Sequence, residues 1–92
     1  MIQSFSDKDT EQLSLQEKNR RFNAIVRVAL HKLIQMNRAG KLDDLKVPLG
    51  NRFEALRGDL AVFHSIRVNQ QWSIVFRWTV HGLTEVAIVD YY

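Results

Sequence analysis

Residues 63–79 read FHSIRVNQQWSIVFRWT, and this stretch decides the fold. Apolar and polar residues alternate on both sides of NQQ (69–71), a pattern typical of two half-buried strands joined by a hairpin loop. A three-residue loop places Val68 opposite Trp72, and His64 then lies on the same face of the sheet as Trp72. We expect this face to be the core and His64 to be a structural histidine.

The opposite face of the same hairpin carries Arg67, with Ser73 opposite it. A further strand is predicted over 84–91, joined to the previous one by a turn at His81-Gly82. This turn predicts that Ser73 also faces Asp90, so that Arg67, Ser73 and Asp90 form one row across three strands.

Outward from the hairpin, the sequence predicts short strands over 2–5 and 52–57. A short helix is expected over 7–15, with Ser6 as its N-cap. A longer helix follows, because apolar residues recur at helical spacing up to a stop at Gly40. Its predicted apolar stripe consists of Phe22, Ile25, Val26, Ala29, Leu30, Leu33 and Ile34.

These elements predict an α+β fold: a small antiparallel sheet with two N-terminal helices packed on one face. The 92 residues are expected to form a single domain, 1–92. The net charge of +3 favours an acidic partner such as nucleic acid. All four basic residues in the second half are arginines, whose planar fork of donors suits phosphate.

Several classes of protein are disfavoured by composition. The chain has no cysteine, and its three histidines lack the spacing of metal ligands, so we expect neither a disulfide framework nor a metal site. Its apolar runs are too short to span a membrane. The sequence therefore predicts a cytoplasmic protein without a membrane or cofactor requirement.

Several motifs, in order along nearly the whole chain, resemble those of the HigB-type toxins of the RelE superfamily. The segments that carry the resemblance are MIQSF (1–5), LGNRFEALRGD (49–59), HSIRVNQQW (64–72), IVFRW (74–78) and IVDYY (88–92). The resemblance implies a RelE-like microbial RNase fold and ribosome-dependent cleavage of mRNA in the decoding site. It implies no cofactor. The implied partners are the ribosome, mRNA and a helix-turn-helix antitoxin, with operator DNA met only through the antitoxin.

The resemblance also implies the catalytic residues. Arg57 matches a basic residue before Gly-Asp, and Asp90 and Tyr91 match the start of the terminal motif. Two positions depart, because the family pattern has arginine where this chain has Ser73 and histidine where it has Tyr92. A serine cannot neutralise a phosphate, and a phenol with a pKa of about 10 is a poor base at neutral pH. We therefore expect weakened cleavage.

Arg67, Arg77 and Phe63 are the expected RNA-binding residues: two cations and a ring on which a base can stack. An arginine on a strand is, taken alone, more often a solvated surface residue. Two alternatives stay open beside the active toxin. One is a catalytically silent toxin-fold protein that binds antitoxin, and even ribosome, without cutting; the other is an unrelated RNA-binding or interaction module.

Overall fold

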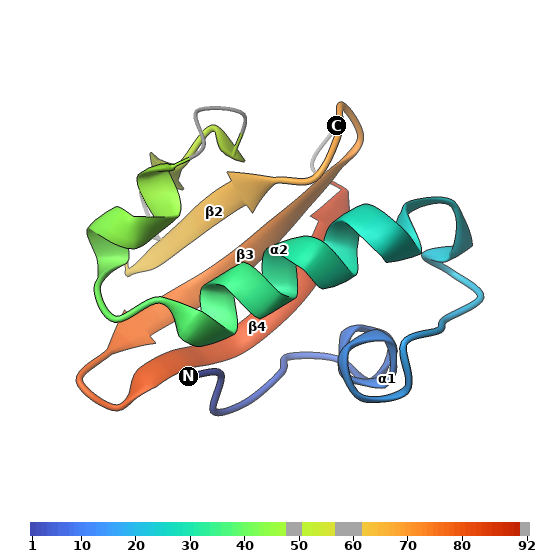
Figure 1. Cartoon of the computed structure of the whole chain (residues 1–92), viewed down its shortest axis with the longest axis horizontal. Helices are drawn as coiled ribbons and strands as arrows, with labels where there is room; N and C mark the ends of the chain where they lie inside the picture. Colours follow the sequence, from blue (N-terminus) through green and yellow to red (C-terminus); the bar gives the residue numbers. More distant parts are fainter. Residues whose placement is uncertain (48–50, 57–61, 91–92) are drawn as a thin grey trace.

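The computed structural model describes residues 1–47, 51–56 and 62–90. Within them the chain folds into a four-stranded antiparallel sheet in the order β1-β2-β3-β4, with both α-helices on one face (Figure 1). The predicted α+β architecture is confirmed. In chain order the elements are α1 (Lys8–Gln16), the 3₁₀ turn η1 (Asn23–Ile25), α2 (Val26–Arg38), the 3₁₀ turn η2 (Leu42–Lys46), β1 (Glu54–Ala55), β2 (Phe63–Arg67), β3 (Trp72–Thr79) and β4 (Gly82–Asp90).

The first helix is capped by Asp7 rather than by the predicted Ser6. Asp7 has extended backbone angles, and its carboxylate accepts a hydrogen bond of 2.6 Å from the backbone N–H of Thr10. Such a bond satisfies an amide that has no partner within the helix. The helix ends at Glu17, whose φ of 59° is left-handed.

The long helix packs its apolar side against β2, β3 and β4. Most of the predicted stripe is buried, but Ile34 is 52% exposed. Ile34 lies one residue, about 100° around the helix, from the core-facing Leu33. The buried cluster consists of Leu13, Phe22, Ile25, Ala29, Leu33, Met36, Leu45, Ile66, Ile74, Phe76, Leu83, Val86 and Ile88. Met36 extends the stripe where the prediction had ended it.

Residues 2–5 line the outer edge of β4, where they form isolated bridges rather than the predicted strand. Ile2 pairs with Leu83 and Phe5 with Val86, both in parallel. Gly82 permits this close approach, because its φ is 121° and a Cβ there would lie 2.3 Å from the Met1 carbonyl oxygen. The N-terminal segment thus protects an edge that would otherwise expose backbone groups.

Farther along the outer edge of β4, the side chain of Thr10 binds a backbone N–H of the strand. Its buried hydroxyl oxygen accepts a hydrogen bond of 3.0 Å from the Ile88 N–H. Thr10→Val keeps the shape but removes the acceptor, so we expect the free energy of unfolding to fall by about 1–3 kcal/mol. Urea unfolding would measure the loss. An unchanged midpoint would show that the Ile88 amide does not depend on Thr10.

The loop before β1 is held by a buried asparagine. The Asn51 amide nitrogen donates to the carbonyl oxygens of Leu45 (3.1 Å) and Val47 (3.4 Å) and to the Gln35 side chain (3.3 Å). Its side-chain oxygen accepts from the Lys32 ammonium. Burial lowers the pKa of Lys32. Asn51 therefore ties α2 to η2 and to the chain that leads into the sheet.

The predicted register of the β2–β3 hairpin is confirmed. Arg67 pairs with Ser73, His64 pairs with Phe76, and the Val68 N–H donates to the Trp72 carbonyl. The loop is closed by Asn69, whose side-chain oxygen accepts from the N–H groups of Gln71 and Trp72.

The predicted register of β3 with β4 is wrong. Asp90 pairs with Trp72, and Ser73 pairs with Val89. Two features of the β3–β4 hairpin shift its register from the predicted one. The hairpin turn lies one position earlier, since Thr79 pairs with Gly82, and a bulge follows near Glu85, whose φ is 55°. A one-residue shift moves a side chain to the other face.

Candidate functional site

The face of the sheet opposite the helices carries the first part of the candidate site. Arg67 and Ser73 are direct partners on β2 and β3, and Val89 of β4 continues their row. Arg67 is half-buried, whereas Ser73 is only 5% exposed. Arg67 and Ser73 are therefore neighbours on this face of the sheet, as the sequence predicted.

Asp90 does not join this row. As the partner of Trp72 it belongs to the helix-covered side, where Trp72 packs its ring edge-to-face against Phe22 at 5.2 Å. The Gln71 side-chain N–H donates to the Asp90 carboxylate at 3.1 Å. The acid thus lies at the end of the β3–β4 pair, held by the hairpin loop. Sequence reasoning placed Gln71 in a turn and missed this contact, since nothing in the local pattern signals it.

Arg77 and Phe63 are direct partners toward the other end of the same sheet. The Arg77 guanidinium lies 3.7 Å from the Glu85 carboxylate, and both side chains are about half exposed. Arg77 also pairs with Thr84 rather than with the predicted Val86. An exposed pair of this kind contributes little stability, but it offsets the charge that Arg77 offers to a phosphate. The contact favours a structural role for Arg77.

Three of the predicted site residues, Arg57, Tyr91 and Tyr92, lie outside the described residues. Their assignment to catalysis stays a prediction. Two of them follow directly on Asp90 in the sequence, and Arg57 comes two residues after β1.

On the helix side, a cation covers two aromatic rings. The Arg21 guanidinium lies 5.1 Å from the centre of the Phe22 ring and 5.6 Å from that of Trp72. It also lies 3.6 Å from the Asp9 carboxylate. These contacts join the α1–α2 connection to the sheet, and they make Trp72 a packing residue rather than a platform for bases.

His64 faces the core, as predicted. Its ring stacks with those of Phe53 (5.3 Å) and Phe76 (6.0 Å), and the Lys46 ammonium lies 5.9 Å from the centre of the Phe53 ring. Its Nδ1 is buried and finds no hydrogen-bond partner among the described residues. Burial lowers the pKa of His64, because a charged imidazolium there would lose hydration.

The lowered pKa of His64 leads us to expect that the stability of the fold decreases in acid. Its folded pKa lies below the unfolded value of about 6.5, so its neutral form favours the folded state fully above that pH. The contribution is lost as pH falls through 6.5 toward the lower folded value. We expect the melting temperature to fall on acidification and to fall less in His64→Phe, which keeps the stack. Calorimetry at several pH values measures both, and equal slopes would contradict this role for His64.

In the part of the chain that the structure describes, no three His, Cys, Asp or Glu side chains are grouped so that they could hold a metal ion. That same part contains no helix with the length and apolar character needed to cross a membrane.

The four-stranded antiparallel sheet with two helices on one face is a small α+β fold of the RelE-like type, and comparison with known proteins agrees. Residues 3–92 match the family model described as the RelE-like toxin of type II toxin-antitoxin system HigB. Toxin HigB-1 of Vibrio cholerae serotype O1 (strain ATCC 39315 / El Tor Inaba N16961) is 39% identical over 80 residues, which cover 85% of this chain and 84% of that protein.

This chain therefore belongs to the HigB family of RelE-like toxins of type II toxin-antitoxin systems. Membership confirms the resemblance found in the sequence and makes an antitoxin its partner.

Proposed function

We propose that this chain is an endoribonuclease that cleaves mRNA in the decoding site of the ribosome, with activity weakened by Ser73 and Tyr92. The observation that carries the proposal is the pairing of Arg67 with Ser73 on the helix-free face, beside the strand end that presents Asp90. Membership in the RelE-like toxins supports it. The proposed setting is the cytoplasm, where the partners are the ribosome, its mRNA and a helix-turn-helix antitoxin.

Amino-acid side chains can supply every group that this cleavage reaction needs. The ribose 2′-OH attacks the adjacent phosphate, the bond to the 5′-oxygen breaks, and the products are a cyclic phosphate and a 5′-OH. A base takes the 2′ proton, an acid protonates the leaving oxygen, and cations stabilise the charge on the phosphorane. We assign proton transfer to Asp90 and Tyr91, and charge stabilisation to Arg57 and Arg67.

Asp90 fits this assignment by its position. It ends β4 directly before Tyr91, and the Gln71 side-chain N–H donates to its carboxylate. The corrected register places this acid on the other side of the strand from Ser73, so Asp90 and Arg67 would approach a phosphate from different sides of the sheet end. Phe63, farther along the open face, is proposed to contact a base.

The test is cleavage by the purified chain of mRNA on ribosomes, compared with the same mRNA without ribosomes. We expect slow cuts on the ribosome and none on free mRNA, and Asp90→Asn should remove them. Equal cutting of free mRNA would contradict the proposal.

A silent toxin-fold protein is the second candidate, and the low exposure of Ser73 favours it, because this hydroxyl is poorly placed to contact a phosphate. The same experiment separates the two. A chain that sediments with ribosomes but leaves the mRNA whole would be the silent form.

A further inference from the structure

The corrected register turns Asp90 away from Arg67, the cation assigned to the same reaction among the described residues. Asp90 is the direct partner of Trp72 and belongs to the helix-covered side of the sheet, whereas Arg67 pairs with Ser73 on the open face. The transition state of RNA cleavage gathers negative charge on the phosphate oxygens, and a cation beside them stabilises it. On the side of Asp90, such a cation can come from an element packed against the sheet.

Arg21 reaches this end of the sheet from the connection between α1 and α2. Figure 1 shows the start of α2 close to the end of β4. The Arg21 guanidinium lies 5.6 Å from the centre of the Trp72 ring, and Phe22 packs against the same ring at 5.2 Å. Direct partners on neighbouring strands have Cβ atoms about 5 Å apart. Trp72 therefore has Asp90 as its cross-strand neighbour and Arg21 over its ring, so both charged residues border one side chain.

Several contacts hold the Arg21 guanidinium in place. It lies over the rings of Phe22 and Trp72, and 3.6 Å from the Asp9 carboxylate. The connection itself is fixed by Asn19, which is only 7% exposed. The Asn19 amide nitrogen donates to Asp9 (3.1 Å), and its oxygen accepts from the Phe22 N–H (3.2 Å). A cation that is already oriented can stabilise transition-state charge without reorganisation.

The charge around Arg21 is basic on the connection and acidic on α1. Residues 17–21 contain one acid and three bases, all exposed: Glu17, Lys18, Arg20 and Arg21. Residues 7–11 contain three acids and one base: Asp7, Lys8, Asp9 and Glu11. Asp9 offsets part of the Arg21 charge, but both side chains are about half exposed, so solvent weakens this pair. A phosphate that approaches from the connection can therefore compete with Asp9 for the guanidinium.

We propose that Arg21 is a further catalytic residue, whose guanidinium binds the scissile phosphate on the Asp90 side of the strand end. The inference deepens the proposed function and rests on it. Arg21 forms no covalent bond: its N–H groups donate to the non-bridging phosphate oxygens while the 2′-oxygen bonds to phosphorus and the 5′-oxygen leaves. Arg21 thereby supplies part of the positive charge that Ser73 lacks.

The test is cleavage of mRNA on ribosomes over a range of concentrations of the chain, which gives a maximal rate and a half-saturating concentration. Arg21→Met keeps an apolar cover over both rings but removes the charge, so the maximal rate should fall about 100-fold while the half-saturating concentration changes less than about threefold. Arg21→Lys keeps the charge but not the planar fork, so its loss should be about 10-fold. In the Ser73→Arg background the Arg21→Met loss should shrink, because two guanidiniums then share one task.

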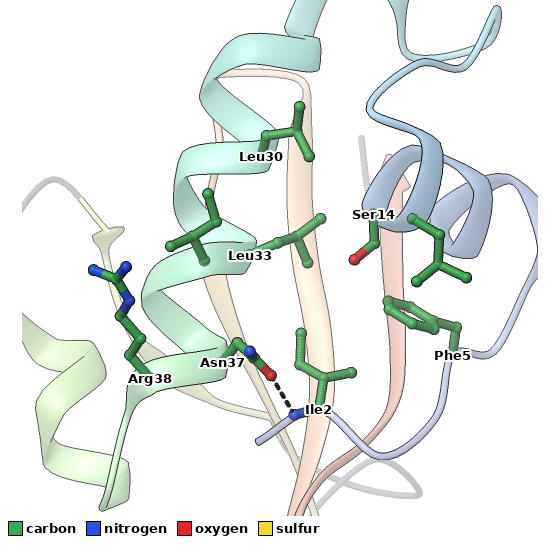
Figure 2. Close-up of a pocket in the computed structure, with 9 residues that line it drawn as sticks. Ile2, Phe5, Ser14, Leu30, Leu33, Asn37 and Arg38 are labelled. Carbon is green, nitrogen blue, oxygen red and sulfur yellow. Dashed lines mark hydrogen bonds between the residues drawn. The ribbon is translucent and has the colours of Figure 1, made fainter.

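Arg38→Met is the matched control, because it removes the same charge at the other end of α2. Figure 2 shows Arg38 next to Asn37 on α2. The helix rises about 18 Å between Val26 and Arg38. An effect of net charge on the encounter with the ribosome appears in the half-saturating concentration. The maximal rate of Arg38→Met should stay within about twofold of the parent rate.

Asp9→Asn separates phosphate binding from a purely structural tie between α1 and the sheet. The change removes the counter-charge of Arg21, and the asparagine oxygen can still accept from Asn19. If Arg21 binds phosphate, the maximal rate should rise about threefold, because the guanidinium no longer shares its charge. A structural tie predicts the opposite result, a lower melting temperature together with a lower rate.

Thermal unfolding checks that each variant folds, and if Arg21→Met does not fold, Arg21→Lys and Asp9→Asn decide the result. A parent-like maximal rate in Arg21→Met would overturn the inference and leave the proposed function standing, as would an equal loss in Arg38→Met. If the parent chain and the Ser73→Arg/Tyr92→His variant both leave the mRNA whole on ribosomes, the proposed function fails, and this inference fails with it.

Discussion

A variant that carries both Ser73→Arg and Tyr92→His should cleave mRNA on the ribosome about 10³-fold faster than the parent chain, or more. Ser73 is the direct partner of Arg67 on the helix-free face, so a guanidinium added there extends from the same surface and doubles its charge. Histidine at the terminus supplies a group whose ordinary pKa of about 6.5 suits proton transfer at neutral pH. Single-turnover rates on ribosomes programmed with one mRNA measure the gain.

Matched controls separate charge and proton transfer from size. Ser73→Met adds length without charge, and Tyr92→Phe removes the phenol without adding a base, so neither should raise the rate. The two restorations need not multiply, because groups that act in one transition state are rarely independent. A parent chain as fast as the double variant would show that Ser73 and Tyr92 do not limit the reaction.

Asn51→Ala should give a large loss of stability, about 3 kcal/mol, because it removes a fully buried side chain together with its hydrogen bonds, one of them to the buried Leu45 carbonyl and the others to partly buried or exposed groups. The groups affected are the carbonyls of Leu45 and Val47, the Gln35 side chain and the Lys32 ammonium. For a domain of this size the melting temperature should fall by about 15 °C. Chemical and thermal unfolding both measure the effect.

A double-mutant cycle with Lys32→Met isolates the ammonium. Because burial already disfavours the charge of Lys32, removing it should recover part of the loss in the Asn51→Ala background. Asn37→Ala is the control: Asn37 is exposed and accepts one hydrogen bond of 2.9 Å from the Ile2 N–H, so it should cost less than about 1 kcal/mol. Equal losses for Asn37→Ala and Asn51→Ala would contradict the role given to Asn51.

The parts of the fold that could be predicted are those governed by local periodicity. Alternation around NQQ (69–71) was enough for the β2–β3 register, because the loop length and the apolar faces agree. Helical spacing likewise indicated α2 and most of its buried side. It could not indicate that Ile34 lies past the edge of the contact, since that depends on how far the sheet extends beneath the helix.

The candidate site could be predicted only in part, for reasons of geometry. The pair Arg67 and Ser73 depends on one short loop, whereas the place of Asp90 depends on a turn and a bulge together. The bulge needs a positive φ at Glu85, which is uncommon outside glycine. Because this position holds a glutamate and not a glycine, the sequence carries no local signal for the bulge. Asn51 illustrates the same limit, because its partners come from separate segments that only the folded chain brings together.

The most direct test of the central claim is mapping of mRNA 5′ ends in bacteria after induction of this chain, with soluble folded protein confirmed in the same cells. The reporter is used in two forms that differ only in the start codon, so that one is translated and the other is not. The account predicts growth arrest and weak cuts within the translated frame, with no cuts in the untranslated form. Cuts at the same sites in both forms would contradict it, as would an intact reporter with both the parent chain and the Ser73→Arg/Tyr92→His variant.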